Sequence, residues 1–376
     1  MESTDYQQLF NELLALAESR GSHAEKLLFL DGGAEISPQV LANLDHKLNH
    51  RVNLDKIPPA WHLYPDLGKI PPIDTQTLEF LPPEISEICV CIGGFYQDQV
   101  YCQWLGRSPL TPVQMWSTTK IVPMIALIMT TLHRNQNRQI APIDNWQIDN
   151  YALLHIYDRI VDYQDQNFSS NALSAMLKQF FHPLELQSWW QKITGNFSLE
   201  FTGLYGEEPY INQPILRDGQ QILLTPADVP HRLGQGRNLV SAYDLVRIFT
   251  LIGLAHHLSP SARLPWLTTD HYRSITHALA RDPAQYVARC LPRVPTFAKM
   301  GFGYSAERQR TEIAYGCFVP VHEGQFLSFG LRGYSNLADP DRCARSIDVR
   351  VAIAVGQLWQ KISNIFTPTD PYLCHA

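Results

Sequence analysis

A serine and a lysine stand three residues apart in the stretch MWSTTKIVPM, residues 115–124. An apolar run follows at once, and a helix that begins here would bring Ser117 and Lys120 onto one face, one turn apart. A serine hydroxyl becomes a useful nucleophile when a neighbouring base takes its proton, and a lysine can be that base once burial and a nearby cation lower its pKa. Taken alone, the same spacing also fits a helix cap followed by a solvated lysine.

Two later stretches could supply the partners that this chemistry needs. SSNALSAML places Ser169 and Asn171 at the start of another helical pattern, where a serine can also be an ordinary cap. FAKMGFG places Lys299 on a predicted strand with Gly301 two residues later, and a glycine there would let a substrate lie against the strand edge. The order and context of the three pairs favour a shared site over three unrelated features.

The three pairs resemble the motifs of serine β-lactamases and penicillin-binding proteins. The resemblance covers about residues 85–365. A fourth stretch, LYGEEPYIN at residues 204–212, is similar to the loop of class A β-lactamases that holds a deacylating water. It matches that loop at Glu208, Pro209 and Asn212, and it implies a cis peptide bond between Glu208 and Pro209. Being short, the pattern also fits an acidic surface turn before a proline.

The resemblance implies a role for each matched residue. Ser117 would attack a carbonyl, Lys120 would take its proton, and Ser169 would pass a proton to the leaving nitrogen. Glu208 would activate the water that releases the acyl group. The residues expected to bind the substrate, hold the water or stabilise the oxyanion are Asn171, Asn212, Lys299, Gly301 and Phe302.

Three positions depart from the family pattern. Met300 replaces the threonine or serine whose hydroxyl binds a substrate carboxylate, so penicillins are expected to be poorer substrates than neutral or aromatic esters. Gly206 stands in place of the arginine that braces the glutamate loop. Pro123 falls early in the predicted nucleophile helix, removes a backbone hydrogen bond and predicts a local kink.

The surrounding patterns indicate how these residues are positioned. Two helical patterns and a proline-rich stretch predict an N-terminal helical extension and linker over residues 1–75, followed by a hydrolase domain over residues 76–376. In that domain, ICVCIGGFY and QVYCQWLG predict a hairpin, and helical patterns dominate about residues 117–290. Three further β patterns and a last helix follow. Strands at both ends with helices between them predict an α+β fold, an antiparallel sheet flanked by helices with an inserted helical subdomain.

The composition argues against several classes of function. A formal net charge of -6 without basic clusters argues against nucleic acid as a partner. The longest apolar run, residues 121–132, is too short to span a membrane. No export signal is visible and the 7 cysteines lack CxxC spacing, so we expect a soluble cytoplasmic protein. The 14 histidines show no ligand spacing, so we expect neither metal nor cofactor.

These observations predict a β-lactamase-like serine hydrolase that forms an acyl-enzyme on Ser117 with a small amide, ester or β-lactam. Two alternatives remain open. A D-alanyl-D-alanine peptidase or penicillin-binding protein would use the same three motifs without fast deacylation. A non-catalytic binding or scaffold protein would keep the fold alone. The sequence sets neither the oligomeric state nor the role of residues 1–75.

Overall fold

The computed structural model describes residues 3–19, 27–29, 37–163, 169–284, 286–291, 294–322 and 324–365. Its centre is a seven-stranded sheet in the order β1-β4-β3-β13-β12-β11, with β2 also paired to β4. All pairs are antiparallel except β2 with β4. The strands are β1 (His62–Leu63), β2 (Ile73–Asp74), β3 (Ile85–Tyr96), β4 (Gln99–Arg107), β11 (Phe297–Ser305), β12 (Arg310–His322) and β13 (Gln325–Ser335). The predicted α+β class is confirmed.

The predicted hairpin of β3 and β4 is also confirmed. Its two turn residues, Gln97 and Asp98, both have positive φ, at 49° and 60°. Two such residues form the kind of tight turn whose twist matches the twist of the flanking strands. The hairpin pairs Tyr96 with Gln99 and continues to Ile88 opposite Arg107.

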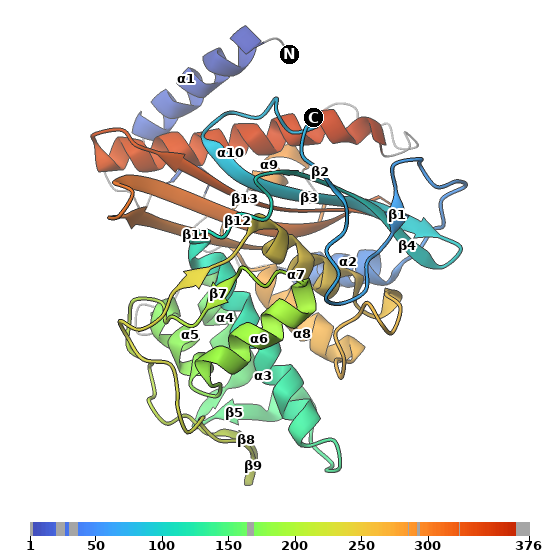
Figure 1. Cartoon of the computed structure of the whole chain (residues 1–376), viewed down its shortest axis with the longest axis vertical. Helices are drawn as coiled ribbons and strands as arrows, with labels where there is room; N and C mark the ends of the chain where they lie inside the picture. Colours follow the sequence, from blue (N-terminus) through green and yellow to red (C-terminus); the bar gives the residue numbers. More distant parts are fainter. Residues whose placement is uncertain are drawn as a thin grey trace.

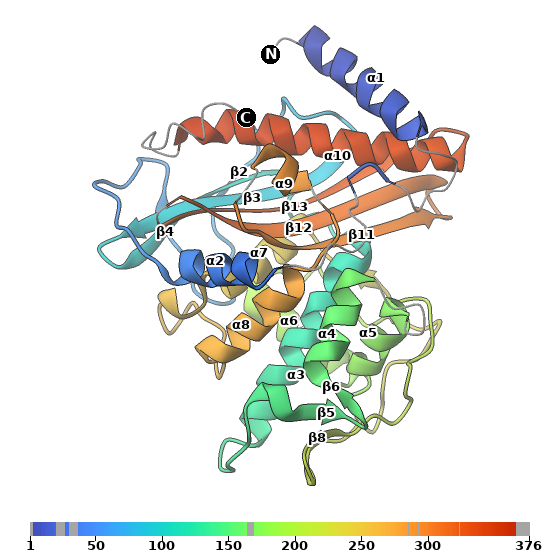
Figure 2. The same ribbon diagram turned by 180° about the vertical axis from the view of Figure 1, so that it is seen from behind.

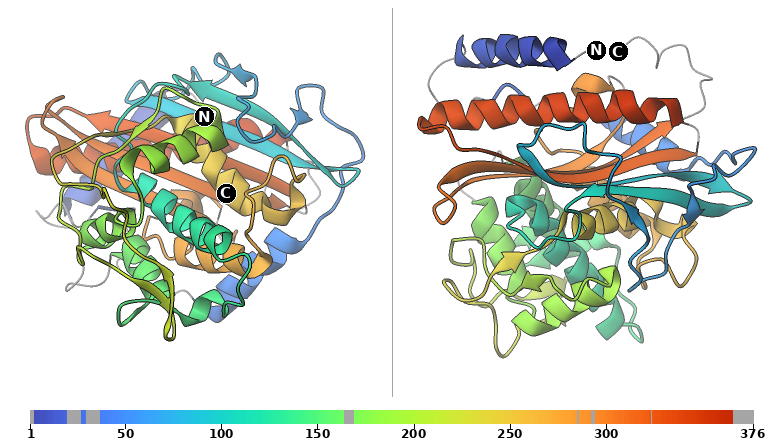
Figure 3. Two further views of the ribbon diagram at one scale, coloured as in Figure 1. Left: turned by 60° about the horizontal axis from the view of Figure 1, so that its bottom comes forward. Right: turned by 45° about the horizontal axis from the view of Figure 1, so that its top comes forward.

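Helices cover both faces of the sheet (Figures 1 and 2). One face packs against α10 (Pro340–Ile362) and α9 (Tyr286–Cys290), and α1 (Ser3–Ser19) lies on the outer side of α10, as the right view of Figure 3 shows. The other face packs against α7 (Ala242–Leu254), which is buried along its whole length. The sheet thus separates two apolar clusters, one toward α10 and one toward α7 and the helical subdomain.

The helical subdomain lies between β4 and β11 in the sequence and projects from the α7 side of the sheet (Figure 1). Its helices are η1 (Trp116–Lys120), α3 (Ile121–Arg134), η2 (Ile143–Asn145), α4 (Leu153–Asp162), α5 (Ser170–Lys178), α6 (Pro183–Thr194), η3 (Ala255–His257) and α8 (Thr269–Leu279). Its short strands are β5 (Trp146–Ile148), β6 (Tyr151–Ala152), β7 (Glu200–Phe201), β8 (Leu216–Asp218), β9 (Gln221–Leu224) and β10 (Asn238–Leu239). A last short turn, η4 (Ser363–Ile365), follows α10.

The N-terminal region contacts both faces of the sheet. The two predicted helices are present as α1 and α2 (Pro38–Asn49), while β1 and β2 join residues 62–63 and 73–74 to the edge of the main sheet. On the α10 side, the backbone N–H of Phe29 donates to the buried carboxylate of Asp348 at 3.2 Å. The domain boundary near residue 75 stays a prediction. In the part of the chain that the structure describes, no helix combines the length and apolar character needed to cross a membrane.

Candidate active site

Ser117 lies in η1, which runs directly into the buried helix α3. Ser117 is half-buried and Lys120, at the end of η1, is 1% exposed. Side chains three residues apart eclipse one another in a 3₁₀ helix, so both belong to the same face. The chain changes from 3₁₀ to α-helix at Ile121, and the kink expected at Pro123 stays a prediction. Pro123 therefore falls in the first turn of α3, where a backbone N–H has no partner inside the helix.

The Lys120 amine is held by α5. Its Nζ donates to Ser170 Oγ at 2.9 Å and to Asn171 Oδ1 at 2.7 Å. Ser170 in turn donates to the carbonyl of Ile160 at 2.7 Å. Lys120 and Asn171, two residues selected from the sequence, therefore contact each other. The hydroxyl on Lys120 comes from Ser170, one residue later than the sequence pattern indicated.

Ser169 occupies a different place from the one expected. It is exposed and caps α5, with its Oγ accepting the backbone N–H of Asn171 at 3.2 Å. The cap fixes the first turn of α5, which carries both groups that bind Lys120. The Ser117 hydroxyl has no hydrogen-bond partner among the described side chains, and its expected contact with Lys120 is absent in this state.

The surroundings of Lys120 favour its neutral form. Burial, and then the positive charge of Lys299, lower the pKa of Lys120 well below that of an ordinary lysine. The Glu207 carboxylate acts in the opposite direction but does not reverse the shift. A neutral amine can accept a proton, so Lys120 has the character of a base.

Lys299 is fully buried on β11 and is saturated with acceptors. Its Nζ donates to the Tyr163 hydroxyl and to the Met300 carbonyl, the latter at 3.1 Å, and lies 3.5 Å from the Val161 carbonyl. It also pairs with the Asp282 carboxylate at 3.2 Å. Burial alone would lower the pKa of Lys299, but Tyr163 and Asp282 raise it above its usual value. Lys299 thus remains a charged amine with a buried counter-ion.

The free edge of β11 lies beside Ser117. A Cβ atom added at Gly301 would come within 2.5 Å of Ser117 N, so only a glycine permits this approach. The N–H of Met300 bonds Asp282 and its C=O accepts from Tyr163, so both point away from β12. Backbone direction alternates along a strand, and the N–H of Phe302 therefore points to the same free edge. The amides of Ser117 and Phe302 are therefore candidate donors to an oxyanion, and this role stays a prediction.

The side chain of Met300 faces away from Ser117. Residues at alternate positions of β11 belong to opposite apolar clusters: Phe297 packs toward α7, and Met300 packs with Ala298 toward α10. The hydroxyl that the family pattern places here is thus replaced by a core side chain.

The glutamate loop differs from the sequence expectation. Glu208 and Asn212 are both exposed. Glu207 instead accepts the Asn171 Nδ2–H at 2.9 Å and acts electrostatically on Lys120. The prediction of a cis peptide bond before Pro209 is wrong, because the described residues contain no cis peptide bond. The register of the loop is therefore shifted by one residue relative to the resemblance.

Lys178 braces this loop from α5. Its Nζ donates to the Gly203 carbonyl at 2.6 Å and to Asn238 Oδ1 at 3.1 Å, and it lies 3.5 Å from the centre of the Phe201 ring. Burial lowers the pKa of Lys178 well below its usual value. The loop, which has Gly206 where the family pattern has an arginine, is thus braced by hydrogen bonds from a buried lysine of a neighbouring helix.

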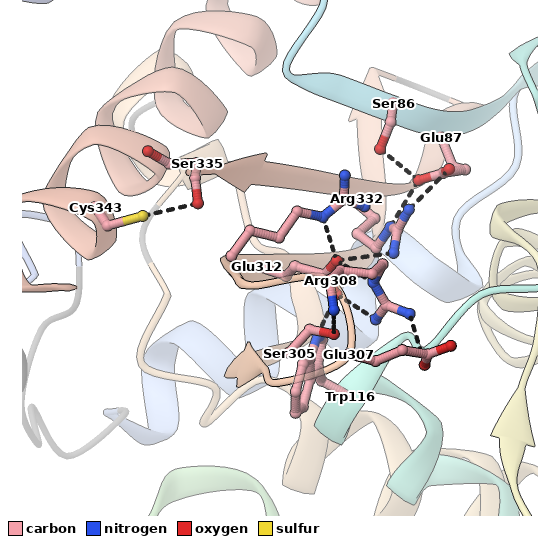
Figure 4. A network of polar contacts seen from close by, with 11 residues as sticks. Ser86, Glu87, Trp116, Ser305, Glu307, Arg308, Glu312, Arg332, Ser335 and Cys343 are labelled. Atoms are coloured by element: carbon pink, nitrogen blue, oxygen red, sulfur yellow. Dashed lines mark hydrogen bonds and ion pairs between the residues drawn. The ribbon is translucent and has the colours of Figure 1, made fainter. Parts of the chain in front are cut away.

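An ion-pair network supports the other side of Ser117 (Figure 4). The preceding residue, Trp116, has a φ of 50° and donates its indole N–H to Glu312 at 3.1 Å. Its ring packs against Gly303, where an added Cβ would come within 2.3 Å of a ring carbon. Burial opposes ionisation of Glu312, but arginine hydrogen bonds and charges lower its pKa. The arginines on this carboxylate are Arg308, Arg310 and Arg332.

Four residues of the site were missed by sequence reasoning. Ser170 and Glu207 are each adjacent to a residue that was chosen, in the pairs SS and EE, where the pattern alone does not decide the register. Tyr163 and Asp282 belong to no motif, and only their contacts with Lys299 reveal them.

Several solved structures resemble this protein in fold, but their sequences are only distantly similar to it. Neither the scan against protein-family models nor the search of curated proteins finds a match. The crystal structure of the TLA-3 extended-spectrum β-lactamase is 11% identical, with a TM-score of 0.48, over 75% of this chain and 96% of that chain. PBP-A, solved as a mutant acyl-enzyme with penicillin G, is 14% identical, with a TM-score of 0.44, over 78% and 100%.

A class A β-lactamase from Mycobacterium abscessus is 12% identical, with a TM-score of 0.42, over 75% of this chain and 96% of that chain. Because identities and TM-scores are this low, the function of this chain is inferred from the residues of its own site.

Proposed function

We propose that this protein is a serine hydrolase that forms an acyl-enzyme on Ser117 with an ester or amide substrate. The observation that carries the proposal is the state of Lys120. It is a buried lysine one helical turn from a half-buried serine, and its surroundings favour the neutral amine. The order of the three sequence motifs supports the same reaction class.

Acylation follows from the positions of the two groups. Ser117 Oγ attacks the carbonyl carbon, and its proton passes to Lys120 Nζ directly or through one water. The carbonyl oxygen becomes an oxyanion, for which the N–H groups of Ser117 and Phe302 are the donors. Loss of one such donor costs roughly 3 to 4 kcal/mol in enzymes where it has been measured. The bond to the leaving group then breaks, and Ser117 keeps the acyl group.

Tyr163 is the candidate to return the proton to the leaving group. Its hydroxyl contacts Lys299, the centre of its ring lies 5.7 Å from Lys120 Nζ, and the residue is 42% exposed. It therefore reaches from the two lysines toward solvent. The relay role that the resemblance gives to Ser169 stays a prediction, and the exposed position of that residue as a helix cap does not support it.

Glu207 is the candidate base for deacylation. It shares Asn171 with Lys120, so its carboxylate is close to the amine that served acylation. A water between Glu207 and the acyl carbon would lose a proton to the carboxylate as it attacks, and Ser117 would be regenerated. The exposure of Glu208 and Asn212 favours a second possibility, in which the acyl group is released slowly, as in a penicillin-binding protein.

Intact-mass analysis tests the proposal. Incubation with a panel of activated esters and β-lactams is expected to add the mass of the acyl group to the Ser117 peptide, and Ser117→Ala should show no increase. Absence of labelling by every probe would favour the non-catalytic reading, and labelling that persists in Ser117→Ala would place the chemistry elsewhere.

A matched pair of variants tests deacylation. Glu207→Gln removes the base but keeps the hydrogen bond with Asn171, so the acyl-enzyme should accumulate, while Glu208→Gln should turn over like the parent. Accumulation in the Glu208 variant instead would restore the assignment from the sequence. Equal behaviour of both variants and the parent would favour the slowly released acyl-protein.

A further inference from the structure

Lys299, which could otherwise bind a substrate carboxylate, is already paired with the carboxylate of Asp282. The two side chains are 0% and 1% exposed, with Nζ 3.2 Å from Oδ2. The same Oδ2 accepts the backbone N–H of Met300 at 2.8 Å, and Oδ1 accepts that of Ala284 at 3.0 Å. Both oxygens of Asp282 are thus bound, and they hold the carboxylate against β11.

Lys299 has no N–H left for a ligand. An ammonium group carries three hydrogens, and four oxygen atoms of this chain already surround Nζ. The backbone groups of Met300 are also already hydrogen-bonded, because its N–H donates to Asp282 and its C=O accepts from the Tyr163 hydroxyl. The protein's own carboxylate therefore occupies an anion position on this strand.

Within the described part of the chain, the other basic residues near the site do not replace Lys299. Burial and Lys299 favour the neutral form of Lys120, and Lys178 is fully buried beneath the glutamate loop. The three arginines near Trp116 are paired with Glu87, Glu307 and Glu312 (Figure 4). What the site presents outward is aromatic: Tyr163 is 42% exposed and Trp116 is half-buried.

We infer that the substrate is an ester or amide without a carboxylate beside the scissile bond, and that Asp282 sets this preference by neutralising Lys299. The inference rests on the proposed acyl-enzyme function. Burying a carboxylate without a counter-ion costs free energy, and the residues described at this site offer an anionic substrate no free cation. An uncharged substrate would instead contact the aromatic groups and the open edge of β11 at Phe302.

Two phenyl esters that differ only in charge test the preference. The acetyl esters of 3-hydroxybenzamide and of 3-hydroxybenzoate have the same shape, and their rates of hydroxide hydrolysis correct for intrinsic reactivity. The parent protein should show a corrected kcat/KM at least about tenfold higher for the benzamide ester. An equal or higher value for the benzoate ester would overturn the inference while leaving the proposed function intact. Failure of both esters, and of every other probe, to acylate Ser117 would instead be the failure of the proposed function.

Asp282→Asn tests the cause. It keeps the shape but removes the charge, so Lys299 becomes an uncompensated cation and the benzoate-to-benzamide ratio should rise about tenfold. A purely structural role would lower both rates and leave the ratio unchanged. Asp348→Asn is the matched control, because Asp348 is also a buried, hydrogen-bonded aspartate but lies on α10. Its ratio should equal that of the parent.

A double variant links the effect to Lys299. In a Lys299→Met background no cation remains to be exposed, so adding Asp282→Asn should leave the ratio unchanged. A rise in the ratio without Lys299 would overturn the inference. If Asp282→Asn alone does not fold, the measurement on the parent protein still decides whether uncharged esters are preferred.

Discussion

Two buried lysines of the site, Lys120 on the helical side and Lys299 on the sheet, have opposite electrostatic states. They are 1% and 0% exposed, so both have lost nearly all contact with water. Lys120 donates to the neutral oxygens of Ser170 and Asn171, and its pKa is lowered. Lys299 pairs with the Asp282 carboxylate, and its pKa is raised. Burial lowers the pKa of both lysines, and the paired carboxylate reverses the direction of the shift only at Lys299.

Lys178 repeats the pattern of Lys120 without any role in the proposed chemistry. It is fully buried, binds only neutral oxygens among the described residues, and has a lowered pKa. A lowered lysine pKa is therefore no sufficient sign of a catalytic base in this protein. What distinguishes Lys120 is its position one turn after Ser117, which itself lies beside β11.

The largest effect is expected from Lys120→Met. This change keeps the volume and the helix but removes the base, so labelling of Ser117 should slow by roughly 100- to 10,000-fold. In the parent, the labelling rate should rise with pH as Lys120 loses its proton, and this rise should start below the pKa of an ordinary lysine. The variant should lack this rise.

Stopped-flow labelling across a pH series, with circular dichroism as a check on folding, measures both expectations. Lys178→Met is the matched control, because it removes a buried lysine of the same kind outside the reaction path. It should keep the pH-dependent rise. An unchanged labelling rate in Lys120→Met would mean that another group takes the proton from Ser117.

Lys299→Met should lower the stability of the fold much more than Lys120→Met does, although Lys120→Met has the larger effect on labelling. Lys299→Met leaves Asp282 buried without its cation, which typically costs about 3 to 5 kcal/mol of the free energy of unfolding. Lys120→Met removes an amine whose charged form is disfavoured by folding, so it should cost little or stabilise the fold below the usual lysine pKa. Urea unfolding of both variants at neutral pH checks this contrast.

The double variant Lys299→Met with Asp282→Asn should recover part of the lost stability, because no unpaired charge remains. Equal unfolding midpoints for the two single variants would show that the Asp282 pair does not have the strength that its geometry indicates.

The sequence predicted the elements of the fold well because their signals are local. The β-rich runs of β3 and β4, the apolar run of α3 and the long periodic pattern of α10 each identify an element from its own residues. The contribution of residues 62–63 and 73–74 to the main sheet was not predicted, because a two-residue strand carries no periodicity.

The site was predicted in part, for a similar reason. Ser117, Lys120, Asn171 and Lys299 follow from motif spacing, and the structure brings the last three together with Tyr163 between the two lysines. Which serine of the pair SS and which glutamate of the pair EE faces Lys120 depends on how the surrounding loop is held. Lys178, for example, holds the glutamate loop through the Gly203 carbonyl. Such contacts between distant residues cannot be predicted from local sequence patterns. Asp282 could not be found at all, because it meets Lys299 only after α8 has packed against β11.

The smallest effect should come from the two serines at the start of α5, and it decides which of them serves Lys120. Ser170→Ala removes one of the two hydrogen-bond acceptors that hold Lys120 and leaves the Ile160 carbonyl without its donor. Asn171 still holds the amine, so labelling of Ser117 should fall by only about tenfold, with a loss of about 1 to 3 kcal/mol in unfolding free energy. Ser169→Ala removes a helix cap, which typically costs about 1 kcal/mol of stability, and should leave the labelling rate nearly unchanged. Labelling rates and urea midpoints measured on both variants separate the two roles, because a capping residue affects stability alone. If Ser169→Ala slows labelling more than Ser170→Ala does, the proton-relay role expected from the sequence belongs to Ser169 after all, and the contact of Ser170 with Lys120 is structural.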